Sequence, residues 1–95
     1  MTTTITNLTN VRDRDENGWT LLHFASARGE LQEVKRLLLA GADVDAKTTN
    51  FFVFNGSRMF KNSTPLHFTT SFGFVDVVQF LLENGADIDV EDENQ

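Results

Sequence analysis

The chain contains one 27-residue stretch twice, and this internal repeat constrains its fold more than any other feature. Residues 20–46 recur as residues 64–90, a shift of 44 residues, with 12 identities in 27 positions. The triplet Asp15-Glu16-Asn17 also returns at 92–94, which is 33 residues beyond that shift. The underlying period is therefore 33 residues, with 11 residues inserted once. A fixed period of this size predicts stacked supersecondary units that share a continuous core.

Each copy carries residues that start and end a short helix. Thr20 and Thr64 are suited to the N-cap, because a threonine hydroxyl can accept a hydrogen bond from a free backbone amide of the first turn. Pro65 then stands at the first helical position, where its missing N–H costs nothing. Gly29 and Gly73 are expected to end this helix in the left-handed conformation.

A second helix is predicted in each copy, over residues 31–39 and 75–83, ending at Gly41 and Gly85. The unit is thus helix, turn, helix and extended loop. The 31–39 helix has one apolar side, which is typical of a terminal, capping repeat, whereas the 75–83 helix is apolar nearly all round, which is typical of an internal repeat. We expect the following side chains of the second copy to lack a neighbour: Phe72, Phe74, Val77 and Phe80.

The second copy carries a set of residues at fixed spacings, namely Thr64-Pro65-Leu66-His67, Gly73, Val78, Leu81-Leu82 and Gly85-Ala86-Asp87. In these residues it resembles an ankyrin repeat, and the resemblance covers about 15–46 and 62–95 of the chain. It implies an all-α repeat solenoid of stacked helix pairs with β-hairpin fingers, and protein binding through the finger tips and the inner helix face. The sequence departs from the pattern at Leu21, which replaces the proline, and at Thr69 and Thr70, which replace small alanines. Those hydroxyls either loosen the packing or bond back to the helix backbone.

We therefore expect a single ankyrin-repeat domain over residues 1–95. Its parts are an N-terminal segment with half a finger (1–14), a capping-like first repeat (15–46), an enlarged β-hairpin finger (47–63), a second repeat (64–90) and the start of a truncated third finger (91–95).

The two histidines, His23 and His67, are interpreted as structural. Each stands three residues after its cap threonine, and the resemblance implies a hydrogen bond to the local backbone there. They occupy equivalent places one repeat apart, whereas one metal ion would need them to converge. The sequence contains no phosphate-binding glycine loop and no nucleophile motif. We expect no catalytic, metal or cofactor site, and hence no enzyme.

The insertion is the least generic segment. Asn55-Gly56 stands between two β-prone runs, which is the strongest short hairpin signal because a type I′ turn needs positive φ at both central residues. A two-residue loop pairs Phe54 with Ser57, Val53 with Arg58, Phe52 with Met59 and Phe51 with Phe60. Two interpretations stay open: the hairpin docks on the repeats, or it projects and binds a partner through Phe52, Phe54, Arg58 and Met59.

The function expected is a non-catalytic scaffold module that binds a protein partner. Further candidate contacts are Trp19, Arg28 and Phe72, with Trp19 alternatively a packing residue, and Arg12 and Arg14 lie on the same expected surface. The second hypothesis is an assembly segment of a longer array, or a homo-oligomer formed through the exposed face of the second repeat.

The net charge and the absence of long apolar runs in the sequence disfavour several kinds of partner and location. The net charge of −6 disfavours nucleic acid and anionic lipid as partners. The N-terminus has no secretory pattern and no apolar run approaches a membrane span. We therefore expect an intracellular, cytoplasmic protein.

Overall fold

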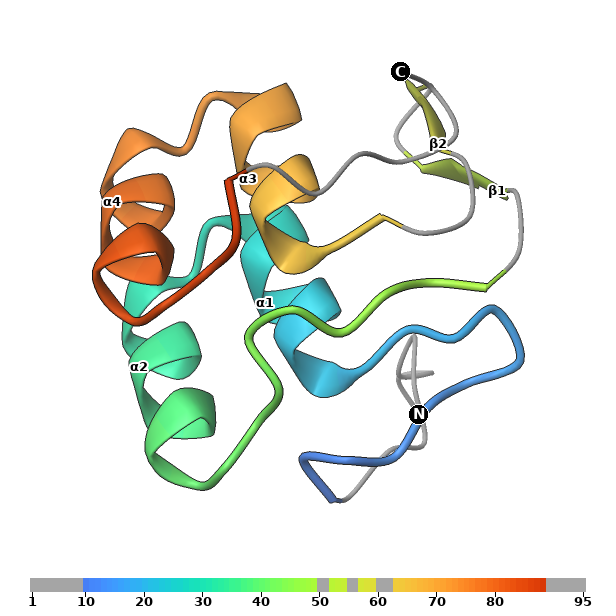
Figure 1. Cartoon of the computed structure of the whole chain (residues 1–95). Coiled ribbons are helices and arrows are strands. Elements are labelled where there is room, and N and C mark those ends of the chain that lie inside the picture. Colours follow the sequence, from blue (N-terminus) through green and yellow to red (C-terminus); the bar gives the residue numbers. More distant parts are fainter. Residues whose placement is uncertain (1–9, 50–51, 55–56, 60–62, 89–95) are drawn as a thin grey trace, which may run out of the picture.

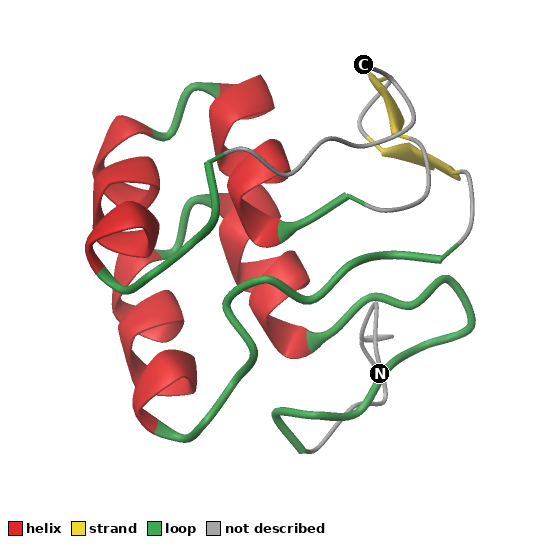
Figure 2. Cartoon of the chain, viewed as in Figure 1, coloured by secondary structure: helices red, strands yellow, loops and turns green. Residues whose placement is uncertain are grey.

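The structure is a computed structural model that describes residues 10–49, 52–54, 57–59 and 63–88. Within these residues the chain forms, in order, α1 (Leu21–Arg28), α2 (Leu31–Leu39), β1 (Phe52–Phe54), β2 (Ser57–Met59), α3 (Pro65–Phe72) and α4 (Val75–Glu83), as Figures 1 and 2 show. The helices predicted over 31–39 and 75–83 are confirmed with those bounds.

The helices form two pairs that stack in the same orientation. In Figure 1, α1 and α3 lie side by side as an inner layer, and α2 and α4 form an outer layer beside them. Within each pair the connection is a tight turn, because Gly29 and Gly73 take φ values of 71° and 77° that other residues rarely adopt. The predicted helical repeat fold is thus confirmed.

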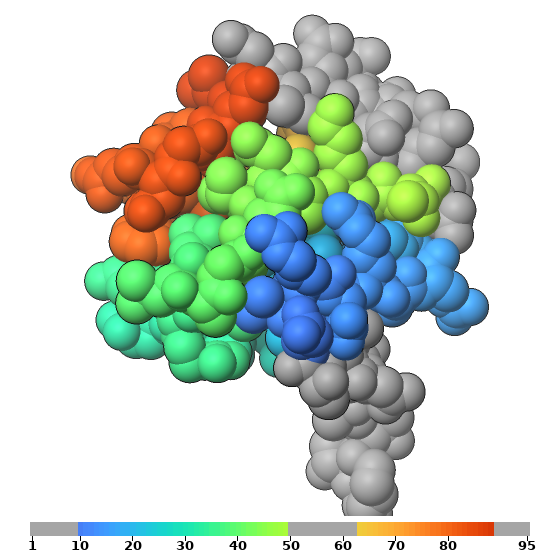
Figure 3. Space-filling view, turned by 60° about the horizontal axis from the view of Figure 1, so that its bottom comes forward, coloured from blue at the N-terminus to red at the C-terminus, as the bar shows by residue number. Residues whose placement is uncertain are grey.

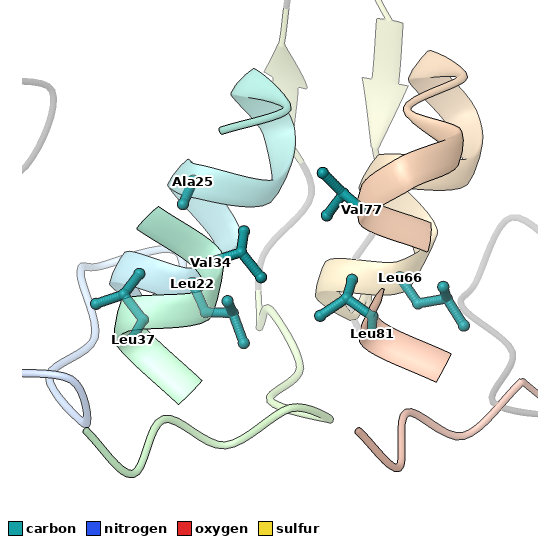
Figure 4. Packing of buried hydrophobic residues seen from close by; sticks show 7 residues of the cluster. All are labelled: Leu22, Ala25, Val34, Leu37, Leu66, Val77 and Leu81. Carbon is teal, nitrogen blue, oxygen red and sulfur yellow. The ribbon is translucent and has the colours of Figure 1, made fainter. Parts of the chain in front are cut away.

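The main core lies between the two pairs. It consists of small and medium apolar side chains from all four helices, namely Leu22, Ala25, Val34, Leu37, Leu66, Val77 and Leu81. Figure 4 shows Val77 and Leu81 pointing from α4 toward the first pair. Each buried side chain of this size contributes about 1.5–3 kcal/mol relative to an exposed one, so the stacking of the pairs is a main source of stability.

A second, aromatic cluster packs against the inner helices. It consists of Trp19, Phe24, Ala27 and Phe68, with Phe72 partly buried against it. The rings of Trp19 and Phe68 stack at 4.7 Å between centroids, and Trp19 approaches Phe24 at 4.6 Å. The single indole therefore joins the loop before α1 to both inner helices.

The hairpin has the predicted register. β1 and β2 are antiparallel, with Phe52 opposite Met59, Val53 opposite Arg58 and Phe54 opposite Ser57. The expected pair of Phe51 and Phe60 lies outside the described residues. In Figure 1 the hairpin lies on the side of the inner layer away from α2 and α4.

The prediction of which apolar side chains lack a neighbour is wrong for Val77. Val77 has no exposed surface and belongs to the main core, while Phe72, Phe74 and Phe80 are half-buried. The exposed apolar side chains of this region are Val75, Leu82 and Ile88. The reason is the rotation of α4: a helix that is apolar nearly all round does not reveal in its sequence which side meets the core.

Candidate functional site

The enlarged finger leaves and re-enters the repeats at one point. The Thr48 amide donates to the Ser63 carbonyl at 2.9 Å, and the Ser63 amide donates to Thr48 Oγ1 at 3.1 Å. Both residues are buried, which strengthens such bonds by excluding competing water. Next to this pair, the Thr49 amide donates to the Asn17 carbonyl at 2.8 Å. The base of the hairpin is therefore fixed to the loop that precedes α1.

The His23 side chain reinforces the same base. Its Nδ1 accepts a hydrogen bond from the Thr20 amide at 2.9 Å, so the proton of the neutral ring is assigned to Nε2. Nε2 then donates to the carbonyls of Ala46 and Ser63, at 2.9 and 3.2 Å. One imidazole thus holds the two chain segments on either side of the insertion.

Burial lowers the pKa of His23 to about 4, and the hydrogen bonds to Ser63 and Ala46 oppose this effect only in part. Desolvation disfavours the charged ring because the side chain has no exposed surface. Protonation would also convert Nδ1 from an acceptor into a donor that faces the Thr20 amide. The geometry suits a neutral, structural imidazole.

The second histidine occupies the equivalent position in the second pair. His67 Nδ1 accepts from the Thr64 amide at 2.8 Å, and Thr64 Oγ1 accepts from the His67 amide at 3.4 Å. Thr20 and Thr64 are the N-caps of α1 and α3, and Pro65 is the first residue of α3. Among the described residues, no three His, Cys, Asp or Glu side chains lie together as metal ligands would.

The hydroxyl of Thr69 bonds back to its own helix. Thr69 Oγ1 donates to the Leu66 carbonyl at 3.0 Å, and the threonine is fully buried. This is one of the two outcomes expected for the departure from alanine, and it removes the cost of burying a free hydroxyl. Thr70 is exposed.

Trp19 does not lie where a binding anchor would be accessible. Its side chain is 3% exposed and stacks on Phe68, as described above. The burial favours the alternative of a packing residue, and Trp19 as a partner contact stays a prediction. The physical reason is that the indole fills the space between the two inner helices and the preceding loop.

Arg28 and Phe72 end the inner helices at equivalent positions, 44 residues apart. Arg28 is exposed and lies 3.9 Å from Glu30 Oε1, a distance at which a surface ion pair contributes little. Phe72 is half-buried and approaches the ring of Phe74 at 6.1 Å between centroids. The structure therefore leaves part of each side chain accessible at the turn end of the inner layer.

The other candidates, Phe52, Phe54, Arg58 and Met59, lie on the hairpin strands, which the structure describes at the level of the backbone. The choice between docking and projection therefore stays a hypothesis. The structure does bring the hairpin to the same side as the loops before α1 and after α2, which we call the finger side (residues 10–19, 40–49 and the hairpin).

Arginine and aspartate contacts connect the segments of the finger side. Arg14 Nη1 donates to the carbonyls of Gly18 and Lys47, at 3.0 and 2.7 Å. Further along, the Asp87 amide donates to Asp45 Oδ1 at 2.9 Å, which joins two successive fingers. Figure 3 shows the blue segment before α1 against the green segment after α2. Arg12 is exposed on the same loop.

Sequence reasoning missed Thr48 and Ser63, whose pairing closes the finger. No local pattern marks them, because each is satisfied by a residue 15 positions away. Their places carried a weak signal, since they stand near the two ends of the predicted finger (47–63), where the loop must be closed.

Comparison with known proteins agrees with this architecture. A family model described as ankyrin repeats (3 copies) matches residues 2–92. A 34-residue stretch is 56% identical to the phytochrome-interacting ankyrin-repeat protein 1 of Arabidopsis thaliana, and covers 36% of this chain and 19% of that relative. The class defined by the helix pairs and fingers is thus a helical repeat protein. The chain belongs to the ankyrin repeat family.

Membership in this family carries a general function. Ankyrin repeats are generally protein–protein interaction modules, and the family is typically non-catalytic. In the part of the chain that the structure describes, no helix is long and apolar enough to cross a membrane.

Proposed function

We propose that this chain binds a protein partner through the finger side and the adjoining inner helices, with the hairpin as the principal contact. The observation that supports this most is the closed base of the insertion. Thr48, Ser63 and His23 hold both ends of the hairpin against the repeats. The base of the loop is therefore already ordered in the free chain, and binding loses less conformational entropy there.

The residues proposed to carry the contact are of the type that dominates interfaces. Aromatic, methionine and arginine side chains are enriched at interface centres, and the hairpin offers Phe52, Phe54, Arg58 and Met59 within two short strands. Arg28 and Phe72 would extend this contact along the inner layer.

The net negative charge of the chain favours a partner with a positively charged surface. With a net charge of −6, the chain attracts a partner surface that carries positive charge, and association slows as salt screens that attraction. A partner segment that combines apolar side chains with lysine or arginine fits both the hairpin and the overall field.

The test compares the intact chain with two variants in affinity capture from the native lysate. In one variant a short glycine turn replaces residues 50–61, which lie between Thr48 and Ser63, so that this closing pair is kept. In the other, Phe52 and Phe54 are both changed to serine. We expect both to keep the helical circular dichroism signal of the parent and to lose the same captured proteins.

The matched control is Leu39→Ser, which removes an exposed apolar side chain at the end of α2, outside the hairpin and outside the inner helices. It should retain every captured protein. Identical capture by the parent and both hairpin variants would refute the proposal. Loss of folding in the serine variant alone would instead show that the hairpin docks on the repeats.

A further inference from the structure

The hairpin is a sheet of two strands, so each strand has one edge that faces away from the other. Among the residues that the structure describes, no third strand joins β1 and β2. An unpaired strand edge presents a row of backbone donors and acceptors on which another extended segment can pair. Strand addition of this kind is a recurring way of holding a peptide, because the backbone supplies the hydrogen bonds.

The register determines which backbone groups of the hairpin face outward. Phe54 lies opposite Ser57, and these two residues flank a two-residue turn. Positions next to such a turn are hydrogen-bonded to each other, and hydrogen-bonded and non-hydrogen-bonded pairs alternate along the strands. The next pair is Val53 and Arg58, which is therefore of the second kind. The amide and carbonyl of Val53 thus face the outer edge of β1.

The arm of the finger that leads to β1 already pairs with a neighbouring segment at its base. Thr48 bonds to Ser63 on the other arm, whereas the amide of the next residue, Thr49, donates to the Asn17 carbonyl at 2.8 Å. The two segments are in close contact, because a Cβ built on Gly18 would lie 2.6 Å from the Thr49 nitrogen. Backbone pairing on this side of the finger is therefore a feature of the free chain.

The two strands of the hairpin differ in composition. β1 consists of Phe52, Val53 and Phe54, which are aromatic or β-branched and uncharged. β2 contains Arg58. Aromatic and β-branched residues favour pairing between strands, whereas a charged residue on an edge strand disfavours it. The edge of β1 is therefore the better of the two for an incoming strand.

The charges near the base of this arm favour a basic occupant. The loop before α1, which pairs with Thr49, carries three carboxylates and two guanidinium groups. Arg14 directs its guanidinium onto two backbone carbonyls, while Asp13 and Glu16 are exposed. The net charge of the whole chain is −6, so a second copy of the chain would be repelled where a basic segment is attracted.

We propose that the outer edge of β1 takes up an extended, basic segment of the partner as a third strand of the hairpin sheet. The amide and carbonyl of Val53 form two of the new backbone hydrogen bonds. This inference rests on the proposed function, because it states how the hairpin holds its partner. A two-stranded ribbon is marginally stable in water and three strands are more stable, so the incoming segment also stabilises the hairpin.

The test uses a defined probe, a capped peptide of about eight residues in which valine and lysine alternate, the pattern of a basic strand. We expect the parent chain to bind this peptide in an NMR titration. Binding should slow hydrogen exchange of the Val53 amide and leave exchange of the Arg58 amide unchanged. The same peptide with every backbone amide methylated keeps its side chains but has no backbone donors, and it should not bind.

Two substitutions at one position separate the backbone from the side chain. Val53→Pro removes the outward amide without removing a hydrogen bond of the hairpin, because proline is tolerated where the N–H faces away from the ladder. We expect it to weaken binding of the valine–lysine peptide by about tenfold or more. Val53→Ala is the matched control, which shortens the side chain and keeps the amide. Its affinity should stay within about threefold of the parent.

The hairpin of each variant is checked by the hydrogen exchange of the Ser57 amide, which lies on the inner side of the ladder. If Val53→Pro opens the hairpin, the comparison of the two peptides on the parent chain still decides the question. Several results would overturn the proposal: failure of the parent to bind the unmethylated peptide, equal binding of both peptides, unchanged affinity in Val53→Pro with the hairpin intact, or protection of the Arg58 amide in place of the Val53 amide.

Two further outcomes are distinguished from the proposed function. If the parent sediments as a dimer and Val53→Pro is a monomer, the edge pairs with a second copy of the chain, and the proposal is wrong. If the variant with serine at Phe52 and Phe54 loses its captured proteins while Val53→Pro keeps them, the hairpin binds through its side chains. The proposed function would then stand, and the inference about the edge of β1 would fail.

Discussion

The buried imidazole of His23 makes the stability of this fold depend on pH. The ring is neutral in the folded chain because burial lowers its pKa to about 4, from an ordinary value of 6.5. Between these two values the unfolded chain binds a proton that the folded chain does not. The stability that the neutral ring provides is therefore complete above about pH 6.5 and is lost as the pH falls toward 4.

The magnitude follows from the difference between the two pKa values. Each unit corresponds to about 1.4 kcal/mol, so complete titration of the unfolded state removes about 3 kcal/mol of the free energy of unfolding. At pH 5 the loss is about 2 kcal/mol. This is a large fraction of the stability of a domain of this size, which is typically about 5–10 kcal/mol.

The assay is urea unfolding of the parent and of His23→Gln at pH 7.5 and pH 5. At pH 7.5 we expect the variant to be less stable by about 1–3 kcal/mol, because the Ala46 and Ser63 carbonyls lose their shared donor. At pH 5 this difference should shrink by about 2 kcal/mol, because the parent alone carries the penalty. Carboxyl groups titrate alike in both chains and cancel.

A direct measurement protects the test against a variant that does not fold. Proton NMR follows the Cε1–H signals of both imidazoles between pH 3.5 and 8, and His67→Gln assigns the signal of His23. A His23 signal that titrates near 6.5 in the folded chain would refute the reasoning. So would a stability difference that stays constant from pH 7.5 to 5.

Three further substitutions test other parts of the structure, each by urea unfolding. Gly29→Ala should cost more than Gly73→Ala: both glycines have positive φ, which costs about 1–2 kcal/mol for alanine, but only at Gly29 does a Cβ also collide with a phenylalanine ring. An equal loss of stability in both variants would contradict the packing of the Phe74 ring over Gly29. Phe68→Ala should destabilise by about 3–5 kcal/mol and shift the emission of Trp19, since their rings stack; unchanged emission would contradict that contact. Ser26→Ala should be neutral or stabilising by up to about 1 kcal/mol, because the buried Ser26 hydroxyl has no hydrogen-bond partner among the described residues; a clear loss would show a bound partner.

Local features of the fold could be predicted from the sequence because local chemistry determines them. The caps Thr20 and Thr64, and the turn glycines, act within a few residues of their own positions. The hairpin register likewise follows from the two residues of its turn. Such features need no knowledge of what lies across the molecule.

Features that depend on distant segments could not be predicted. The Nε2 atom of His23 bonds residues 23 and 40 positions away, and Trp19 stacks on a ring in the other repeat. The rotation of α4 about its axis could not be inferred from the sequence either, because Val75 and Val77 are the same residue type but only Val77 is buried. The identity of the partner-binding residues stays a prediction for the same reason.

The closed junction at Thr48 and Ser63 makes the length and sequence of the finger largely independent of the stacking of the repeats. Because the bonds between Thr48 and Ser63, together with those of Thr49 and His23, close the loop at its base, we expect the helices to keep their stacking when the intervening segment is lengthened, shortened or exchanged. Loop closure becomes only about 0.6 kcal/mol less favourable for each doubling of length. The junction is therefore a natural graft point, at which foreign peptides could be displayed on an otherwise unchanged scaffold.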